Sequence, residues 1–138
     1  MAELLPVIDT VRLRLRALEP GDADDMAANM TPGVTRWLAS WPSPMSREEA
    51  LARIDRSRRA IQAGGYAFYA LTRRTDGRMI GGFGGALVAE APGRMEISYH
   101  LAEDCQGQGL MREAAGAVLP MLWRLLPADV MEAGAQLG

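Results

Sequence analysis

The chain has 138 residues, of which 49% are apolar and 23% are charged, and its net charge is -2. These values are typical of one soluble domain with a buried core, and they exclude a general electrostatic attraction to nucleic acid or to an anionic membrane. One cysteine excludes an internal disulfide framework, and no signal peptide or membrane-spanning apolar run is found. We therefore expect a cytoplasmic protein with a single domain over residues 1–138.

Alternating apolar and polar residues predict a first strand over 11–18. A short helix over 22–30 follows, and Asp22 is placed to cap it. The next segment predicts an ordered loop or a broken helix that contains Trp37 and Trp41. These tryptophans belong either to the core or to a groove for an acceptor substrate.

A longer helix begins at the capping box Ser46–Glu49 and extends to about residue 62. Its inner face carries Leu51, Ile54 and Ile61. Its arginines are expected to form a solvated outer face: Arg53, Arg56, Arg58 and Arg59. The residues after this helix predict a hairpin of strands 66–73 and 79–88, because Asp76-Gly77 is a strong turn signal.

A third strand over 94–102 is followed by a helix from Leu110 to Leu126, in which Pro120 removes a hydrogen bond and should cause a kink. Its buried face is expected to comprise Met111, Ala115, Val118, Leu122 and Leu125. A last strand, 130–136, should lie parallel to residues 95–101, because a helix connects the two. The result is an α+β fold of three layers, with a mixed, mostly antiparallel sheet flanked by helices.

The junction before this helix reads Gln106-Gly107-Gln108-Gly109-Leu110-Met111. The first turn of a helix has backbone N–H groups without partners and a partial positive charge, and glycine lets the backbone approach a ligand closely. The junction therefore predicts a site for an anion such as a diphosphate. A second glycine-rich stretch, Gly81–Gly85, lies inside a strand and opens no helix, so close sheet packing is its favoured interpretation.

Glu96, Ser98 and His100 share one face of their strand. A hydrolase triad is disfavoured because residues two apart on a strand are separated by about 6.5 Å and no nucleophile elbow surrounds Ser98. Glu96 is a better candidate for a general base, and His100 for a backbone contributor. Cys105 precedes the anion loop, where a helix terminus can lower a thiol pKa, but we expect it to be a bystander. One histidine and one cysteine provide too few ligands for a zinc site.

Tyr99-His100-Leu101 followed by Gln106–Ala114 resembles the acetyl-CoA-binding motif of the GNAT N-acetyltransferases, in which Gln or Arg precedes two variable residues, a Gly, a variable residue and Gly or Ala. Met111 stands where that pattern has Gly or Ala. The opening Thr10–Arg16 and the stretch Glu96–Tyr99 also resemble the Rim-type enzymes, which acetylate the N-termini of ribosomal proteins.

The resemblance implies an N-acetyltransferase that uses acetyl-CoA, requires no metal, and acetylates an amine-bearing small molecule or a protein N-terminus by direct attack. It implies that the strand holds the pantetheine arm and polarises the thioester carbonyl, while the loop and Arg112 hold the diphosphate. Glu96 is the expected catalytic residue. The implied cofactor-binding residues are Tyr99, His100, Leu101, Gln106, Gly107, Gln108, Gly109, Leu110, Met111 and Arg112.

The ending differs from the family pattern. Residues 130–136 resemble the strand after the cofactor helix, and in the family a further helix and two strands follow. We therefore expect a GNAT fold that is C-terminally truncated, with an exposed sheet edge that favours a homodimer. The alternative function is a catalytically inactive module, built on the same half-fold, that binds acyl-CoA or a protein partner.

Overall fold

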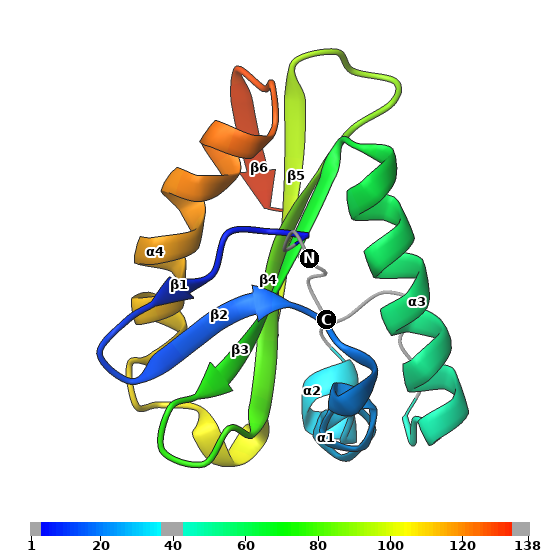
Figure 1. The fold of residues 1–138 in the computed structure, drawn as a ribbon, viewed down its shortest axis with the longest axis vertical. Helices are drawn as coiled ribbons and strands as arrows, with labels where there is room; N and C mark the ends of the chain where they lie inside the picture. Colours follow the sequence, from blue (N-terminus) through cyan, green and yellow to red (C-terminus); the bar gives the residue numbers. More distant parts are fainter. Residues whose placement is uncertain (1–3, 37–42, 134–138) are drawn as a thin grey trace.

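The computed structural model describes residues 4–36 and 43–133. An open sheet of six strands runs in the order β1-β2-β3-β4-β5-β6, with the bounds Ile8–Asp9, Leu13–Ala17, Tyr66–Arg73, Met79–Leu87, Arg94–Leu101 and Val130–Ala133. Helix α4 (Leu110–Leu125) covers one face (Figure 1). The opposite side carries α1 (Ala23–Asn29), α2 (Pro32–Thr35) and α3 (Arg47–Ala63). The three-layer α+β fold predicted from the sequence is confirmed.

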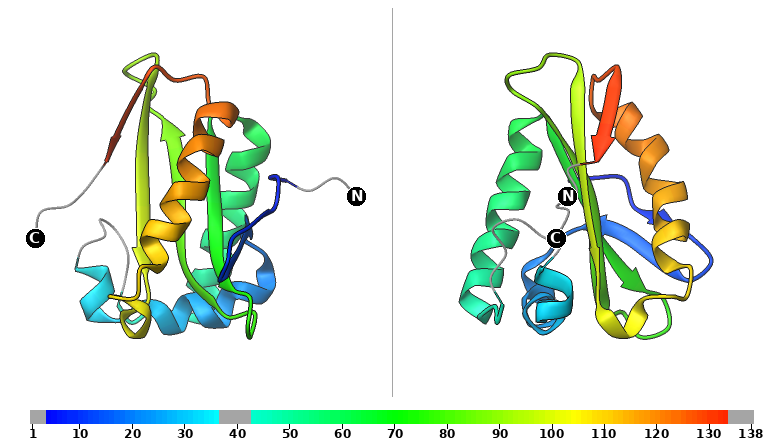
Figure 2. Two further views of the ribbon diagram at one scale, coloured as in Figure 1. Left: turned by 90° about the vertical axis from the view of Figure 1, so that its left-hand side faces the viewer. Right: turned by 180° about the vertical axis from the view of Figure 1, so that it is seen from behind.

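Strands β1 to β5 pair antiparallel with their neighbours, and β6 pairs parallel with β5 from Arg94↔Val130 to Ile97↔Ala133. Helix α4 makes the crossover between these parallel strands, as Figure 2 shows from two further sides. The parallel pairing predicted for the last strand is confirmed as far as Ala133. Strand β1 was not predicted, because two residues are too few to show a periodicity. Trp37, Trp41 and residues 134–136 lie outside the described residues.

The larger apolar cluster lies between α4 and the sheet. Tyr69, Phe83 and Met95 are among its sheet residues. The fully buried row of α4 consists of residues four apart: Leu110, Ala114, Val118 and Leu122. The predicted inner face is therefore confirmed for Val118 and Leu122, holds in part for Met111 and Ala115, which pack against the cluster, and is wrong for Leu125. Met111 and Ala115 are only partly buried, and Leu125 is 36% exposed. Both ends of the helix carry adjacent apolar residues, so the periodicity alone allowed either register.

Helix α3 packs on the opposite face of the sheet. The Ser46 half of the predicted capping box is confirmed, since Ser46 Oγ accepts a hydrogen bond of 3.0 Å from the Glu49 N–H. The Glu49 carboxylate instead pairs with Arg53 Nε at 2.9 Å. Ile54 is buried, whereas Leu51 and Ile61 are only partly buried and Ala50 and Ser57 occupy the remaining inner positions. The outer face is less solvated than expected, because the Arg58 guanidinium donates to Leu18 O at 2.8 Å and the Arg53 side chain is only 20% exposed.

Asp22 has a different role from the predicted helix cap. Its carboxylate makes no side-chain cap of α1 and instead accepts hydrogen bonds of 2.8 and 2.9 Å from the Arg16 guanidinium. It also accepts the Glu19 N–H at 2.8 Å. This buried carboxylate therefore joins the end of β2 to the turn that leads into α1. Helix α4 continues through Pro120, and the kink there stays a prediction.

The glycines of β4 are buried in the middle of the sheet. A Cβ on Gly84 would lie 2.5 Å from Ala67 O and 2.8 Å from the Phe68 Cα, and a Cβ on Gly85 would lie 2.8 Å from the Met95 Sδ. The interpretation of Gly81–Gly85 as small residues for close packing is confirmed.

None of the helices described is long and apolar enough to cross a bilayer.

We expect Gly84→Ala to lower the free energy of unfolding by about 2–3 kcal/mol, because the added methyl group meets backbone atoms that no side-chain rotation can move. Gly116→Ala is the matched control. No atom lies within 4 Å of its added Cβ, so it should raise stability by about 0.5–1 kcal/mol through helix propensity. Urea unfolding of both variants measures the difference, and equal stabilities would contradict the packing argument.

Candidate functional site

The chain leaves β5 through the short turn Glu103–Cys105 and enters α4 through two glycines in the left-handed region. Gly107 and Gly109 both have φ of +78°, and Gly109 is the N-cap residue of α4. No atom lies within 4 Å of a Cβ placed on Gly107. The position needs glycine for its backbone conformation rather than for lack of space.

The backbone at this junction presents a row of hydrogen-bond donors. Within the residues described, the N–H groups from Gly107 to Arg112 have no acceptor, and the first bond of the helix runs from Glu113 N to Gly109 O at 3.1 Å. The Arg112 side chain is exposed and has no ion-pair partner in the described part of the chain. Together with the partial positive charge of a helix N-terminus, these donors suit an anion with several oxygens.

Side chains of the loop fix its shape. Gln106 Nε2 donates to Leu101 O at 3.0 Å, and Gln108 Nε2 donates to Asp104 O at 3.1 Å. The Asp104 carboxylate accepts hydrogen bonds of 2.7 and 3.0 Å from the Arg78 guanidinium, which lower its pKa below the usual range. The loop is thus fastened to the end of β5 and to the start of β4, while its own amides remain available.

The end of β5 carries backbone groups on the side that faces away from β4. Ala102 N donates to Ile80 O at 2.8 Å, and the N–H groups of a strand alternate in direction. The amides of Tyr99 and Leu101 therefore point away from β4, toward the side where β6 lies. The described part of β6 pairs with β5 only as far as Ile97, so these two amides lie beyond that pairing.

The aromatic rings of β5 lie on opposite faces of the sheet. His100 is buried and stacks on Phe68 with a centroid distance of 6.2 Å. Burial lowers the pKa of His100 to about 4, so its imidazole is neutral at pH 7. Tyr99 is 45% exposed and stacks on Phe83 at 5.4 Å. The two rings hold the end of β5 between the two apolar layers.

The other residues weighed from the sequence differ in their surroundings. Glu96 and Ser98 are exposed on the face of β5 that carries His100. Cys105 is buried, and its pKa is raised by burial and by the Asp104 carboxylate. Its thiol is therefore protonated at neutral pH, which agrees with a bystander and disfavours an acyl-cysteine. Over residues 4–36 and 43–133, no three potential metal ligands gather closely enough to hold a metal ion.

Sequence reasoning missed the residues that support the loop. Arg78 was assigned to no site, and the opening Thr10–Arg16 was noted only as a strand and as part of the resemblance. In the structure, Arg12 contacts both the loop and Glu113 in the first turn of α4. Arg12 lies in the connection between β1 and β2, and its partner Glu113 lies 101 residues away in the chain, so no local pattern indicates this pair.

The comparisons with known proteins assign the chain to a family. The family model described as "Acetyltransferase (GNAT) domain" matches residues 12–137. The chain therefore belongs to the GNAT acetyltransferases, a family of acyltransferases. A search of curated protein sequences found no match.

Solved structures share the fold at low sequence identity. A protein of Bordetella pertussis assigned to the GNAT family is 24% identical, with a TM-score of 0.70, and the match covers 91% of this chain and 76% of that one. The acetyltransferase of Salmonella typhimurium that modifies the N-terminal serine of ribosomal protein L7/L12 is 20% identical, with a TM-score of 0.73 and coverages of 89% and 71%. A protein of T. thermophilus assigned as an acetyltransferase is 17% identical, with a TM-score of 0.76 and coverages of 99% and 70%.

The surroundings of His100 predict how it titrates. Its pKa in the folded chain lies near 4, below the ordinary 6.5, so the unfolded chain binds the proton more readily between these values. The stability that His100 contributes is complete above about pH 6.5 and is lost as the pH falls toward 4. An NMR titration should show its Cε1–H shift constant from pH 7.5 to 5.5. A midpoint near 6.5 would contradict the burial argument.

Proposed function

We propose that this chain transfers an acetyl group from acetyl-CoA to a primary amine, such as a protein N-terminal α-amine, by direct attack in a ternary complex. The observation that carries the proposal is the row of available backbone donors from Gly107 to Arg112, which lies beside the end of β5 beyond its described pairing with β6. Membership in the GNAT family agrees with it. Acetyl-CoA supplies the activated acetyl thioester, and the chain's own residues do the remaining work.

The diphosphate of the cofactor fits the junction. Its oxygens need several donors in one place, and the amides from Gly107 to Arg112 supply them without any rearrangement of a side chain. The exposed Arg112 guanidinium adds a positive charge at the same helix end. Gln106 and Gln108 act indirectly, because their side-chain amides hold the loop rather than face outward.

The thioester carbonyl is proposed to lie beside the end of β5. The backbone amides of Tyr99 and Leu101 point to that side, and a fixed N–H donor stabilises the negative charge that develops on a carbonyl oxygen during acyl transfer. His100 contributes its backbone and its packing on Phe68, since its imidazole is buried and neutral. This strand end therefore combines rigidity with directed donors.

The acceptor amine must lose a proton before it can attack. A protein α-amine has a pKa of about 8, so a modest base is sufficient near neutral pH. Glu96 is the proposed base, because its carboxylate is exposed on the face of β5 that also carries His100. The Salmonella typhimurium protein modifies an N-terminal serine, which makes a peptide with that end a suitable first acceptor.

Calorimetry of acetyl-CoA binding tests the proposed diphosphate site at Gly107–Arg112. Gly109→Val should weaken it by about 100-fold, because a β-branched residue cannot adopt the required φ of +78° and the loop amides would be displaced. Arg112→Gln should weaken it by about tenfold. Arg124→Gln, at the other end of α4, is the matched control and should bind like the parent. Parental affinity in Gly109→Val would place the cofactor elsewhere.

Release of free thiol with a Ser-initiated peptide tests turnover. Glu96→Gln should lower kcat by about 100-fold and leave the KM for acetyl-CoA unchanged, since the carboxylate acts on the amine and not on the cofactor. Glu90→Gln, an exposed carboxylate in the β4–β5 connection, is the control. An unchanged kcat in Glu96→Gln would exclude it as the base. A parent chain that binds acetyl-CoA but releases no thiol with any amine would favour the inactive binding module.

A further inference from the structure

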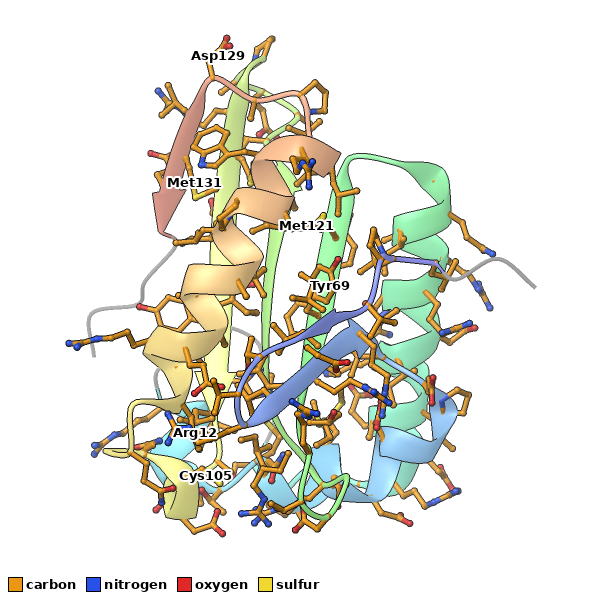
Figure 3. All side chains as sticks on the ribbon, turned by 60° about the vertical axis from the view of Figure 1, so that its left-hand side comes forward. Arg12, Tyr69, Cys105, Met121, Asp129 and Met131 are labelled. Atoms are coloured by element: carbon orange, nitrogen blue, oxygen red, sulfur yellow. The ribbon has the colours of Figure 1, made fainter. Side chains whose placement is uncertain are left out.

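Arg12 joins the anion-binding loop to the first turn of α4. Its Nη1 donates to Gln108 O at 2.9 Å, and its Nε donates to Glu113 Oε1 at 2.7 Å. The side chain reaches both from the connection between β1 and β2. Figure 3 shows Arg12 at the level where α4 begins, close to the turn that holds Cys105. One guanidinium therefore connects three segments that are far apart in the sequence.

The Glu113 carboxylate is engaged on both oxygens. Besides the Arg12 side chain, the Arg12 backbone N–H donates to Oε2 at 2.8 Å, and the Thr10 hydroxyl donates to the same oxygen at 2.5 Å. Burial raises the pKa of Glu113, but these hydrogen bonds together lower it below its usual range. The carboxylate is thus ionised at neutral pH and is directed toward Thr10 and Arg12.

This carboxylate would otherwise oppose the function of the site. A negative charge in the first turn stabilises the helix itself, yet it repels a diphosphate that binds to the same turn. The Arg12 guanidinium, whose Nε lies 2.7 Å from Glu113 Oε1, offsets the charge of this carboxylate. The positive charges of Arg112 and of the helix N-terminus then act on an anion at the loop without this opposing charge.

We propose that Arg12 is a positioning residue that holds the Gln108 carbonyl in place and neutralises Glu113, so that the loop is ready for a diphosphate before the cofactor arrives. This proposal rests on the proposed function for its ligand. The contact with the loop is close, since Arg12 Nη2 lies 3.6 Å from a Cβ placed on Gly109.

The exposure of the pair argues that its main effect falls on the loop. The Arg12 side chain is 45% exposed and Glu113 is 18% exposed, and ion pairs with this much solvent contribute little to the free energy of unfolding. The fold is held by the two apolar clusters, whereas the loop has few apolar contacts of its own: Gln106 to Gly109 are all exposed. Loss of Arg12 should therefore change cofactor affinity far more than the unfolding temperature.

A set of variants separates position from charge, with acetyl-CoA as the probe in calorimetry. Arg12→Met should raise the Kd for acetyl-CoA about tenfold, which corresponds to an ordinary interaction energy between residues in contact. It should leave the unfolding temperature nearly unchanged. The double variant Arg12→Met/Glu113→Gln should bind more tightly than Arg12→Met, because the uncompensated carboxylate is gone. Arg12→Lys keeps the charge but lacks the planar guanidinium that donates to two partners at once. Its Kd for acetyl-CoA should therefore lie between those of Arg12→Met and the parent.

Arg14→Met is the matched control, because Arg14 makes an exposed ion pair of 2.8 Å with Asp9, and among the described residues its side chain has no hydrogen bond or ion pair with the loop. It should bind acetyl-CoA like the parent. The proposal is overturned if Arg12→Met also binds like the parent, or if the double variant binds no more tightly than Arg12→Met.

A measurement without ligand keeps this proposal distinct from the proposed function. The {1H}-15N heteronuclear NOEs of the loop amides from Gly107 to Leu110 should fall in ligand-free Arg12→Met and stay at parental values in Arg14→Met. Equal NOEs in Arg12→Met and the parent overturn the positioning role. If the parent itself fails to bind acetyl-CoA, the proposed function is wrong, and the NOE comparison still decides whether Arg12 positions the loop.

Discussion

Unsatisfied backbone donors between β5 and α4 are the constraint around which the rest of the chain is arranged. A helix always begins with N–H groups that lack partners inside the helix, and most proteins supply a capping side chain. Here the N-cap is Gly109, which has no side chain to offer, and the amides before and after it stay available. The loop is held by its own Gln106 and Gln108 side chains. Two arginines from other segments add to this: Arg78, which binds Asp104, and Arg12, which binds the Gln108 carbonyl.

Most of the fold could be predicted because its elements are locally encoded. Ser46 and Glu49 specified the start of α3, and Asp76-Gly77 specified the hairpin. The predictions failed where a side chain could take more than one role or position that its neighbours in the sequence allow. Asp22 is a good helix cap by type, yet the Arg16 guanidinium offered it a charged partner in a buried position. For α4, Leu110 and Met111 are equally apolar, and only packing against the sheet selects Leu110. The homodimer through an exposed sheet edge and the cytoplasmic location stay predictions.

The candidate site could be predicted only in part for a physical reason. The groups that the site presents are backbone amides, and a glycine pattern before a helix predicts them directly. The arginines that support the loop from outside it, Arg12 and Arg78, directly precede β2 and β4, and their roles exist only after the chain has folded. Nothing near Arg12 in the sequence indicates Glu113, and nothing near Arg78 indicates Asp104, because the partners in each pair meet through the sheet topology. Local sequence patterns therefore predict the backbone amides of the loop more readily than the distant side chains that hold the loop in place.

The sheet also divides the apolar interior into two clusters that share no residue. One is covered mainly by α4 and borders the proposed cofactor site, and the other is covered by α1 and α3, although Ile61 of α3 also packs against the first. Free-energy changes at separated sites are close to additive, so sequence changes beneath α3 can accumulate with little effect on the packing beneath α4. The ring of Phe68, stacked on His100, is the point where the second cluster meets the end of β5. A lineage could thus remodel one side of the protein while the opposite side keeps its shape, except where changes reach that ring.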